Sequence, residues 1–189
     1  MADLKKVIFE NALALITKKG FDQVTVSEIC KACDITKKTF YSYYSSKDRI
    51  LLDFYHDMTG RVLESLPVIV QEKRPVDLLW KCQEVGADII LEVGPELMRS
   101  VYTCDLINRA GINSMDNTAD SIYRRVILEY AIQAQKNREI RTDVSPQNMM
   151  RLYYAATNGI VLAWINSEGR LDLKKELEWA FEILFQCTH

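Results

Sequence analysis

The stretch DITKKTFYSYYSSKDRI, residues 34–50, holds three lysines, one arginine and four aromatic residues within 17 positions. A buried helix does not carry so many charges, and a helix that only faces solvent does not carry so many aromatic rings. We therefore expect this segment to bind something outside the protein.

Capping signals divide this region into short helices. Thr25 followed by Glu28 is a capping box, which predicts a helix over residues 26–33. Thr36 is the next cap candidate and predicts a helix over residues 37–43. Two short helices joined by a turn of three or four residues, of which the second begins with lysines, are typical of a helix-turn-helix.

The second of these helices should bury Phe40 and turn its basic and polar side chains outward. Lysine ammonium and tyrosine hydroxyl groups suit phosphate oxygens, whereas Lys38, Thr39 and Ser42 can reach base edges in a major groove. The alternative is ordinary solvent exposure of the lysines and boundary packing of the tyrosines. The candidate DNA-binding residues of the whole region are Thr25, Thr36, Lys37, Lys38, Thr39, Tyr41, Ser42, Tyr43 and Lys47.

Residues 20–52, GFDQVTVSEICKACDITKKTFYSYYSSKDRILL, match a longer pattern without gaps. The matching positions are Gly20-Phe21, Thr25-Val26, Ile29, Ala32, Ile35-Thr36, Phe40-Tyr41, Tyr43-Tyr44 and Ser46-Lys47-Asp48. This run resembles the DNA-binding region of the TetR family of bacterial transcription regulators. The resemblance implies that residues 26–33 form the positioning helix and residues 37–43 the recognition helix.

The resemblance also bears on single residues. Tyr41, Tyr43 and Lys47 match positions that commonly touch phosphates in the family. Two residues depart from the family pattern, because glycine is frequent where this sequence has Asp34, and a small residue is frequent where it has Lys38. Asp34 tolerates a left-handed turn conformation, so the fold is compatible with it. Lys38 adds a cation to the outward face and is expected to alter which operator is read.

The composition fits a soluble globular protein with a sizeable core, since 48% of the 189 residues are hydrophobic and 26% are charged. No run of about 18 apolar residues is present to span a bilayer. Glu10 and Asn11 would interrupt the apolar region of a signal peptide. We expect a cytoplasmic protein that has no membrane partner.

The cysteine pattern favours free thiols and no metal site. Cys30 and Cys33 form a C-x-x-C pair, but no second pair follows at the spacing of a zinc ribbon. An odd number of cysteines without an export signal also argues against a disulfide framework. The simpler interpretation is two small residues on one helix, and no cofactor is expected. The five cysteines are Cys30, Cys33, Cys82, Cys104 and Cys187.

Charge is divided unevenly along the chain. Residues 1–50 hold nine basic and six acidic residues, whereas the remainder holds 15 basic and 20 acidic residues. A basic segment followed by an acidic one suggests that the first part meets a polyanion. We expect a DNA-binding domain over residues 1–46 and a larger domain over residues 47–189.

Helical periodicity runs through almost every segment, and no clean alternation indicates a strand. The predicted fold class is all-α, with an N-terminal three-helix head and a C-terminal helical body. Gly20, Pro67 and later turn signals mark the helix ends. The nine predicted helices cover residues 3–19, 26–33, 37–43, 47–66, 76–92, 96–109, 118–137, 147–167 and 172–187.

The last two predicted helices carry more apolar surface than one core contact requires. One face can pack on the body and the other on a symmetric copy, as in the family, which residues 139–185 also resemble. The alternative is a fully buried helix in a monomer. The candidate dimer-interface residues are Leu152, Ala156, Gly159, Ile160, Ala163, Leu177, Phe181 and Leu184.

The resemblance implies that a small molecule binds among the middle helices and releases the protein from DNA. Such a switch requires different ligand affinities in two conformations. The candidate lining residues are equally compatible with ordinary core packing. They are Trp80, Met98, Tyr102, Cys104 and Tyr123, and no cluster of charges among them specifies the chemistry of the ligand.

Together these patterns predict a ligand-responsive transcriptional repressor that binds a palindromic operator in double-stranded DNA as a homodimer. The alternative is a helical sensor or interaction protein without sequence-specific DNA binding. An enzyme is not expected, because the sequence has no nucleophile elbow, phosphate loop or metal-spaced cluster. His56 beside Asp57 is best explained as a solvent-facing residue.

Overall fold

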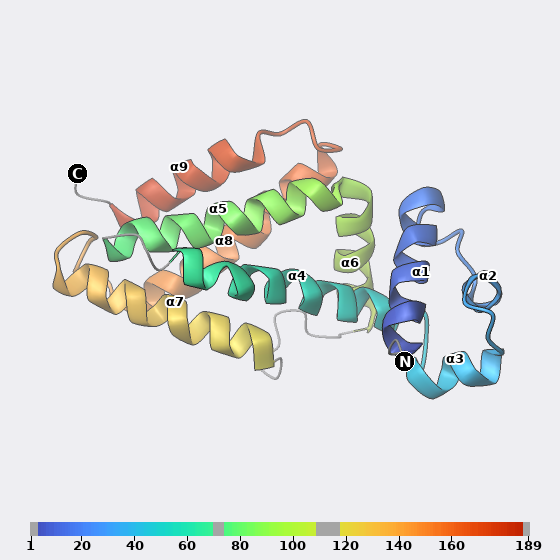
Figure 1. Ribbon diagram of the computed structural model, residues 1–189. Helices are drawn as coiled ribbons and strands as arrows, with labels where there is room; N and C mark the ends of the chain where they lie inside the picture. Colours follow the sequence, from blue (N-terminus) through green and yellow to red (C-terminus); the bar gives the residue numbers. More distant parts are fainter. Residues whose placement is uncertain (1–3, 70–73, 109–117, 187–189) are drawn as a thin grey trace. The chain divides into compact units, whose positions relative to one another are not determined.

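The computed structural model describes residues 4–69, 74–108 and 118–186, and these residues form nine helices and no strand (Figure 1). The predicted all-α fold is therefore confirmed, and each predicted helix is present. Their bounds are α1 Leu4–Lys19, α2 Val26–Ala32, α3 Lys37–Tyr43, α4 Asp48–Ile69, α5 Pro75–Val93, α6 Pro95–Asn108, α7 Thr118–Lys136, α8 Pro146–Asn166 and α9 Leu173–Phe185.

The chain divides into two compact units. Unit 1 comprises Met1–Tyr55 and Glu96–Asn113, and unit 2 comprises His56–Pro95 and Ser114–His189. The start of α4 belongs to unit 1 because Ile50 is fully buried in the same cluster as the residues of α1 to α3.

The core of unit 1 is built from one residue per turn of α1 and from the inner faces of the short helices. Ile8, Ala12 and Ile16 of α1 pack with Ile29 of α2 and Phe40 of α3, and all five are almost completely buried. The inward direction predicted for Phe40 is thus confirmed. The α3 helix is fixed to the rest of the head by this aromatic ring, which leaves its opposite face free for contact with other molecules.

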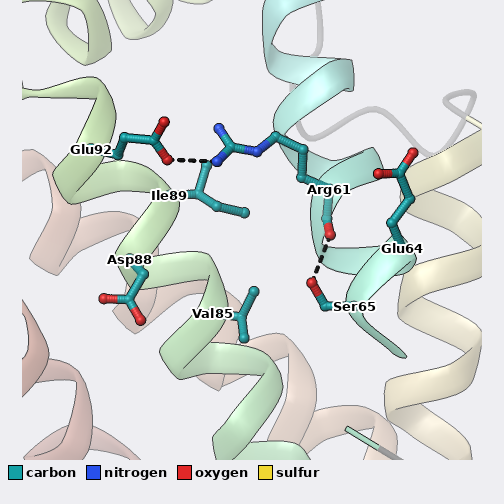
Figure 2. Close-up of a pocket in the computed structure, with 7 residues that line it drawn as sticks. All are labelled: Arg61, Glu64, Ser65, Val85, Asp88, Ile89 and Glu92. Atoms are coloured by element: carbon teal, nitrogen blue, oxygen red, sulfur yellow. Dashed lines mark hydrogen bonds and ion pairs between the residues drawn. The ribbon is translucent and has the colours of Figure 1, made fainter. Parts of the chain in front are cut away.

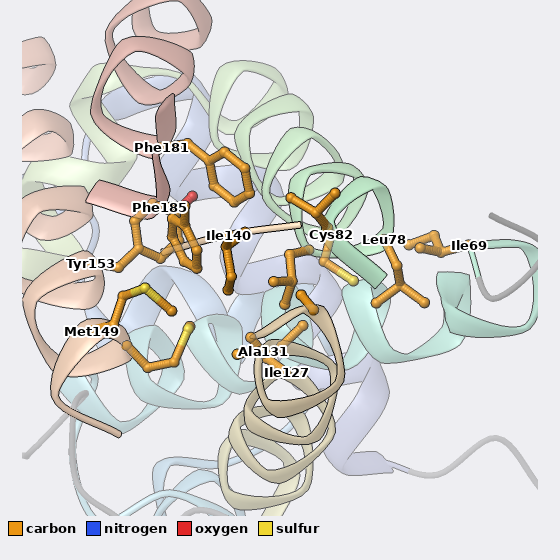
Figure 3. Packing of buried hydrophobic residues seen from close by; sticks show 14 residues of the cluster. Ile69, Leu78, Cys82, Ile127, Ala131, Ile140, Met149, Tyr153, Phe181 and Phe185 are labelled. Carbon is orange, nitrogen blue, oxygen red and sulfur yellow. The ribbon is translucent and has the colours of Figure 1, made fainter. Parts of the chain in front are cut away.

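The core of unit 2 lies among α5, α7, α8, α9 and the end of α4. Its buried residues include Cys82, Ala131, Met149, Phe181 and Phe185 (Figure 3). At the end near α9 the packing is aromatic, because the rings of Phe181 and Phe185 stack with their centroids 4.3 Å apart. Every residue of this buried cluster is apolar apart from the hydroxyl of a tyrosine and the thiol of a cysteine.

Helix α4 continues beyond the end that Pro67 predicts. The helix ends at Ile69, so the proline lies inside its last turn. A proline there removes one backbone hydrogen bond, but Pro67 is exposed and only two residues of helix follow it. The buried side chain of Ile69 belongs to the core of unit 2, and this packing favours continuation of the helix.

Candidate DNA interface and effector region

The start of α2 is held by the capping box that the sequence predicts. The Glu28 backbone N–H donates to Thr25 Oγ1 over 3.2 Å, and the Thr25 N–H donates to Glu28 Oε2 over 2.9 Å. Lys19 Nζ donates to the other carboxylate oxygen over 2.7 Å. The hydrogen bonds from Lys19 and then from Thr25 lower the pKa of Glu28 to about 2. The Thr25 side chain, a DNA-binding candidate, is therefore already used for this cap.

The turn between α2 and α3 contains Asp34 in the left-handed conformation, with φ of 53°. This is the position where the family often has glycine, and a short side chain that bonds locally tolerates it. The Thr36 side chain then caps α3 by accepting the Thr39 N–H over 3.1 Å. The orientation of α3 is thus set by local hydrogen bonds as well as by Phe40.

The outward face of α3 carries the cations and rings that the sequence predicts there. Lys37, Lys38 and Ser42 are exposed, and the exposed fractions of Tyr41 and Tyr43 are 53% and 42%. Neither lysine forms an ion pair with any residue that the structure describes. Two uncompensated cations and two phenol groups on one rigid helix face form a surface that suits the phosphates and groove edges of DNA.

Lys47 has a role that the sequence did not reveal. Its Nζ donates to the backbone carbonyls of Phe21 over 2.6 Å and Val24 over 2.8 Å, and lies 4.0 Å from the centroid of the Phe21 ring. The side chain therefore ties the residue before α4 to the loop between α1 and α2. An ammonium group has three donors, so one remains for the phosphate contact that the family resemblance implies. That contact stays a prediction.

The five predicted effector-binding residues fall into different units. Trp80 and Tyr123 pack, partly buried, against the core of unit 2. Met98 and Cys104 are buried on α6 in unit 1, where Cys104 Sγ lies 3.7 Å from the Asp48 carbonyl oxygen. Burial and the nearby Asp105 carboxylate raise the pKa of Tyr102 to about 12. Only Trp80 lines a recess described below.

A recess of about 380 Å³ lies between α4 and α5 in unit 2. Val85 and Ile89 form its apolar side, and Arg61 crosses it to pair with Glu92 (Figure 2). Asp88, a further lining residue, pairs with Lys174 of α9 over 2.6 Å. The sequence did not single out any of these residues. The complete lining consists of Arg61, Glu64, Ser65, Val85, Asp88, Ile89 and Glu92.

A second recess, of about 140 Å³, lies between α5 and α9. Trp80 and Phe181 form its inner wall, with their ring centroids 5.5 Å apart. Its rim is charged and includes Arg74, Asp77 and Glu178. Its volume is below the range of about 300–1,000 Å³ usual for sites that enclose a whole small molecule.

The predicted dimer face on α8 and α9 is partly exposed in the single chain. Leu152, Gly159 and Ala163 are exposed, and Ala156, Ile160 and Leu184 are half-buried. Leu177 and Phe181 are instead buried, with exposed fractions of 0% and 4%, and Phe181 belongs to the core of unit 2.

The exposed apolar side of α9 is formed by Trp179 and Ile183, which are 60% and 50% exposed. These two residues widen the apolar stripe of the last helix in the sequence, but only the structure separates them from the side that faces the core. Leu152 and Leu162 of α8, which are 58% and 44% exposed, are the large apolar residues exposed on the other helix.

The head of the protein resembles known proteins in sequence. Residues 8–54 match the family model of bacterial regulatory proteins, tetR family. The head of the chain is therefore similar to the DNA-binding region of the TetR family. The HTH-type transcriptional regulator YuxN of Bacillus subtilis is 42% identical over 62 residues. That similarity covers 31% of this chain, and the chain spans only 21% of the length of YuxN.

Two solved structures share their fold with this chain over nearly its whole length. Thermus thermophilus FadR, a TetR-family transcriptional repressor in complex with lauroyl-CoA, is 24% identical with a TM-score of 0.73, over 95% of this chain and 92% of FadR. AibR in complex with isovaleryl coenzyme A and operator DNA is 22% identical with a TM-score of 0.63, over 98% of this chain and 100% of AibR.

Neither a metal-binding cluster nor a membrane-spanning helix is found among the described residues. The residues that the structure describes contain no group of three or more His, Cys, Asp or Glu side chains placed to hold a metal ion. Within the same ranges, no helix is long and apolar enough to cross a membrane. Cys30, Cys33, Cys82 and Cys104 are free thiols, whereas Cys187 lies outside the described residues.

Proposed function

We propose that this protein is a transcriptional repressor that binds a palindromic operator as a homodimer and is released from DNA by a small molecule. The observation that carries the proposal is the outward face of α3, where Lys37 and Lys38 are exposed and unpaired among the described residues beside two exposed tyrosines. The two neighbouring ammonium groups repel each other, and an anion such as a DNA phosphate would compensate this repulsion.

Dimer formation is supported by the exposed apolar side chains on α8 and α9. Trp179, Ile183 and Leu152 are each at least half exposed, and a cluster of large apolar residues at a surface is typical of a protein interface. A homodimer places two heads on one DNA face, so that half-sites about one helical turn or more apart are read together.

Control by a small molecule is supported by the structural neighbours. FadR and AibR were solved with lauroyl-CoA and isovaleryl coenzyme A, and the AibR complex also contains operator DNA. Release from DNA requires that the ligand bind more tightly to the conformation that does not fit the operator. A second candidate function, a helical sensor that does not read DNA sequence, requires a damaged recognition face, and the face of α3 is intact.

The first experiment is fluorescence anisotropy with labelled DNA from upstream of the protein's own gene, against random DNA of equal length, over a series of salt concentrations. We expect preferential binding of two chains per site, with an affinity that falls as salt rises. Equal, weak binding to both DNAs, followed by failure of a random-sequence selection to enrich any site, would favour the sensor without sequence-specific DNA binding.

A further inference from the structure

The recess between α5 and α9 combines aromatic rings with an excess of acidic side chains. Trp80 and Phe181 form its inner wall, with ring centroids 5.5 Å apart. The charged residues that line it are Asp77, Glu178, Glu182 and Arg74, so acids outnumber bases. The face of an aromatic ring attracts a cation, and carboxylates bind cations through charge-assisted hydrogen bonds. The recess therefore suits a positively charged group.

The two acids that α9 contributes are not compensated within the chain. Glu178 and Glu182 are exposed, and neither forms an ion pair with a residue that the structure describes. Residues four apart are neighbours on a helix surface, where two like charges destabilise the helix. The acid from α5 differs, because Asp77 Oδ2 lies 3.9 Å from Arg74 Nε. A cation that enters the recess would compensate the two charges of α9.

The size of the recess limits what can occupy it. Its volume of about 140 Å³ is small for a whole ligand molecule but sufficient for the end of one long side chain. Of the two long basic side chains, arginine matches the lining better. Its planar guanidinium stacks on an aromatic ring and pairs with carboxylates through several N–H groups, whereas the lysine ammonium is a compact, strongly hydrated charge.

One arginine of the chain is available for such a contact. Arg151 of α8 is exposed, and no described residue forms an ion pair with it. Residues two apart lie about 200° apart around an α-helix, so Arg151 points outward when Tyr153 is buried in the core. The neighbouring Leu152, which is 58% exposed, belongs to the apolar surface of α8 and α9 that supports the homodimer.

Arg151 and the recess lie at the same end of the pair formed by α8 and α9. The Tyr153 ring contacts the rings of Phe181 and Phe185, with centroid distances of 5.7 and 5.1 Å (Figure 3). The first residues of α8 therefore lie beside the last residues of α9, where Phe181 also lines the recess. A two-fold axis along this helix pair brings equivalent ends of two chains together, and each recess then meets the beginning of the partner's α8.

We infer that the recess between α5 and α9 receives the Arg151 guanidinium of a second copy of this chain. The guanidinium lies against the Trp80 ring and is bound by the carboxylates of Glu178 and Glu182. Symmetry repeats the contact, so that each copy both donates an arginine and receives one. Charged contacts of this kind fix the register and the choice of partner, whereas the apolar residues supply buried area. The inference rests on the homodimer of the proposed function.

The test uses the full chain without DNA, and sedimentation equilibrium measures the dissociation constant of the dimer. Arg151→Glu brings an acid to the acidic recess, and the double variant Glu178→Arg with Glu182→Arg brings bases to Arg151. We expect each to raise the dissociation constant about 10- to 100-fold, because both symmetric contacts become repulsive. Arg125→Glu is the matched control, because it reverses an exposed arginine on α7, and it should leave the constant nearly unchanged.

An equimolar mixture of the two reversed proteins shows whether the contact is between chains. In a mixed dimer, the new acid of one chain faces the new bases of the other, and the remaining Arg151 faces an unaltered recess. Both contacts are therefore restored, and the mixed dimer should form with a dissociation constant within about 3-fold of the wild-type value. A fluorescent label on one variant identifies the mixed species, and circular dichroism of each variant alone verifies its fold.

Two results would overturn the inference: equal dissociation constants for Arg151→Glu and Arg125→Glu, or a mixture that dimerises no better than either reversed protein alone. If the wild type is a dimer, either result leaves the homodimer of the proposed function intact. A wild type that stays monomeric at every concentration would contradict the proposed homodimer as well.

Discussion

The ammonium group of Lys47 is fixed by the Phe21 and Val24 carbonyls at distances of 2.6 and 2.8 Å, so its charge has a defined position on the head. Replacement by Met keeps most of the side-chain volume and removes both hydrogen bonds. We expect Lys47→Met to lower the free energy of unfolding by about 1–2 kcal/mol, because hydrogen bonds from charged groups are stronger than neutral ones. Urea unfolding followed by circular dichroism measures this difference. An unchanged unfolding midpoint would show that these two hydrogen bonds do not stabilise the head.

The two neighbouring lysines of α3 allow a matched comparison of roles in DNA binding. Lys38→Ala should reduce the preference for operator over random DNA, by about 1–3 kcal/mol if the side chain contacts a base edge. Lys37→Ala should weaken binding to both DNAs equally and reduce the slope of log affinity against log salt by about one. Anisotropy titrations on both DNAs measure these effects. Equal losses on operator and random DNA for both variants would refute this division of roles.

At the scale of the element, the capping box of α2 makes the stability of the head depend on acidity. The pKa of Glu28 is lowered from its ordinary value near 4.5 to about 2, first by Lys19 and then by Thr25. A lowered pKa in the folded state means that the stabilisation is complete above about pH 4.5 and is lost as the pH falls toward 2. Glu28→Gln retains a residue that supports a capping box but does not titrate.

We therefore expect the unfolding temperature of the wild type to fall more steeply than that of Glu28→Gln between pH 4.5 and 2. Calorimetry at several pH values measures both slopes, and Thr25→Ser, which preserves the cap, is the control that should follow the wild type. Parallel curves for wild type and Glu28→Gln would show that the carboxylate does not contribute in this range.

Short helices were predictable here because their signals are local. Thr25 caps α2 and Thr36 caps α3, as the sequence predicts. The end of α4 was predicted wrongly because Pro67 is a local signal, whereas the burial of the side chain two residues later depends on the packing of the whole of unit 2. Competition between a local and a tertiary preference is not visible in periodicity alone.

At the scale of the whole molecule, the proposed homodimer is expected to form through the exposed apolar side chains of α8 and α9. Trp179→Lys should weaken the dimer at least 10-fold, because it places a charge in the apolar centre of the proposed interface. Leu91→Lys is the control, since Leu91 is 41% exposed but lies on α5, which is not one of the two helices of this face. Sedimentation equilibrium measures both constants. Equal dimer stability in the two variants would exclude this face as the interface.

The candidate sites were only partly predictable from sequence. The outward residues of α3 follow from the helical period and one buried ring, so Lys37, Lys38 and Tyr41 lie where expected. The recess between α4 and α5 combines residues that are about 20 to 30 positions apart, such as Arg61 with Glu92, and no local pattern brings them together. On α9, periodicity identifies an apolar stripe but does not tell which side faces the core of unit 2 and which faces outward.

The three tryptophans occupy three different environments. Their indole fluorescence can therefore report on three different parts of the protein. Trp179 is 60% exposed on the proposed interface, Trp164 is 2% exposed in the interior, and Trp80 lines the recess beside Phe181. Indole emission shifts to shorter wavelength as water is excluded. Versions of the chain that retain one indole each would therefore report self-association, core integrity and occupancy of the recess as separate spectral changes, without an added dye.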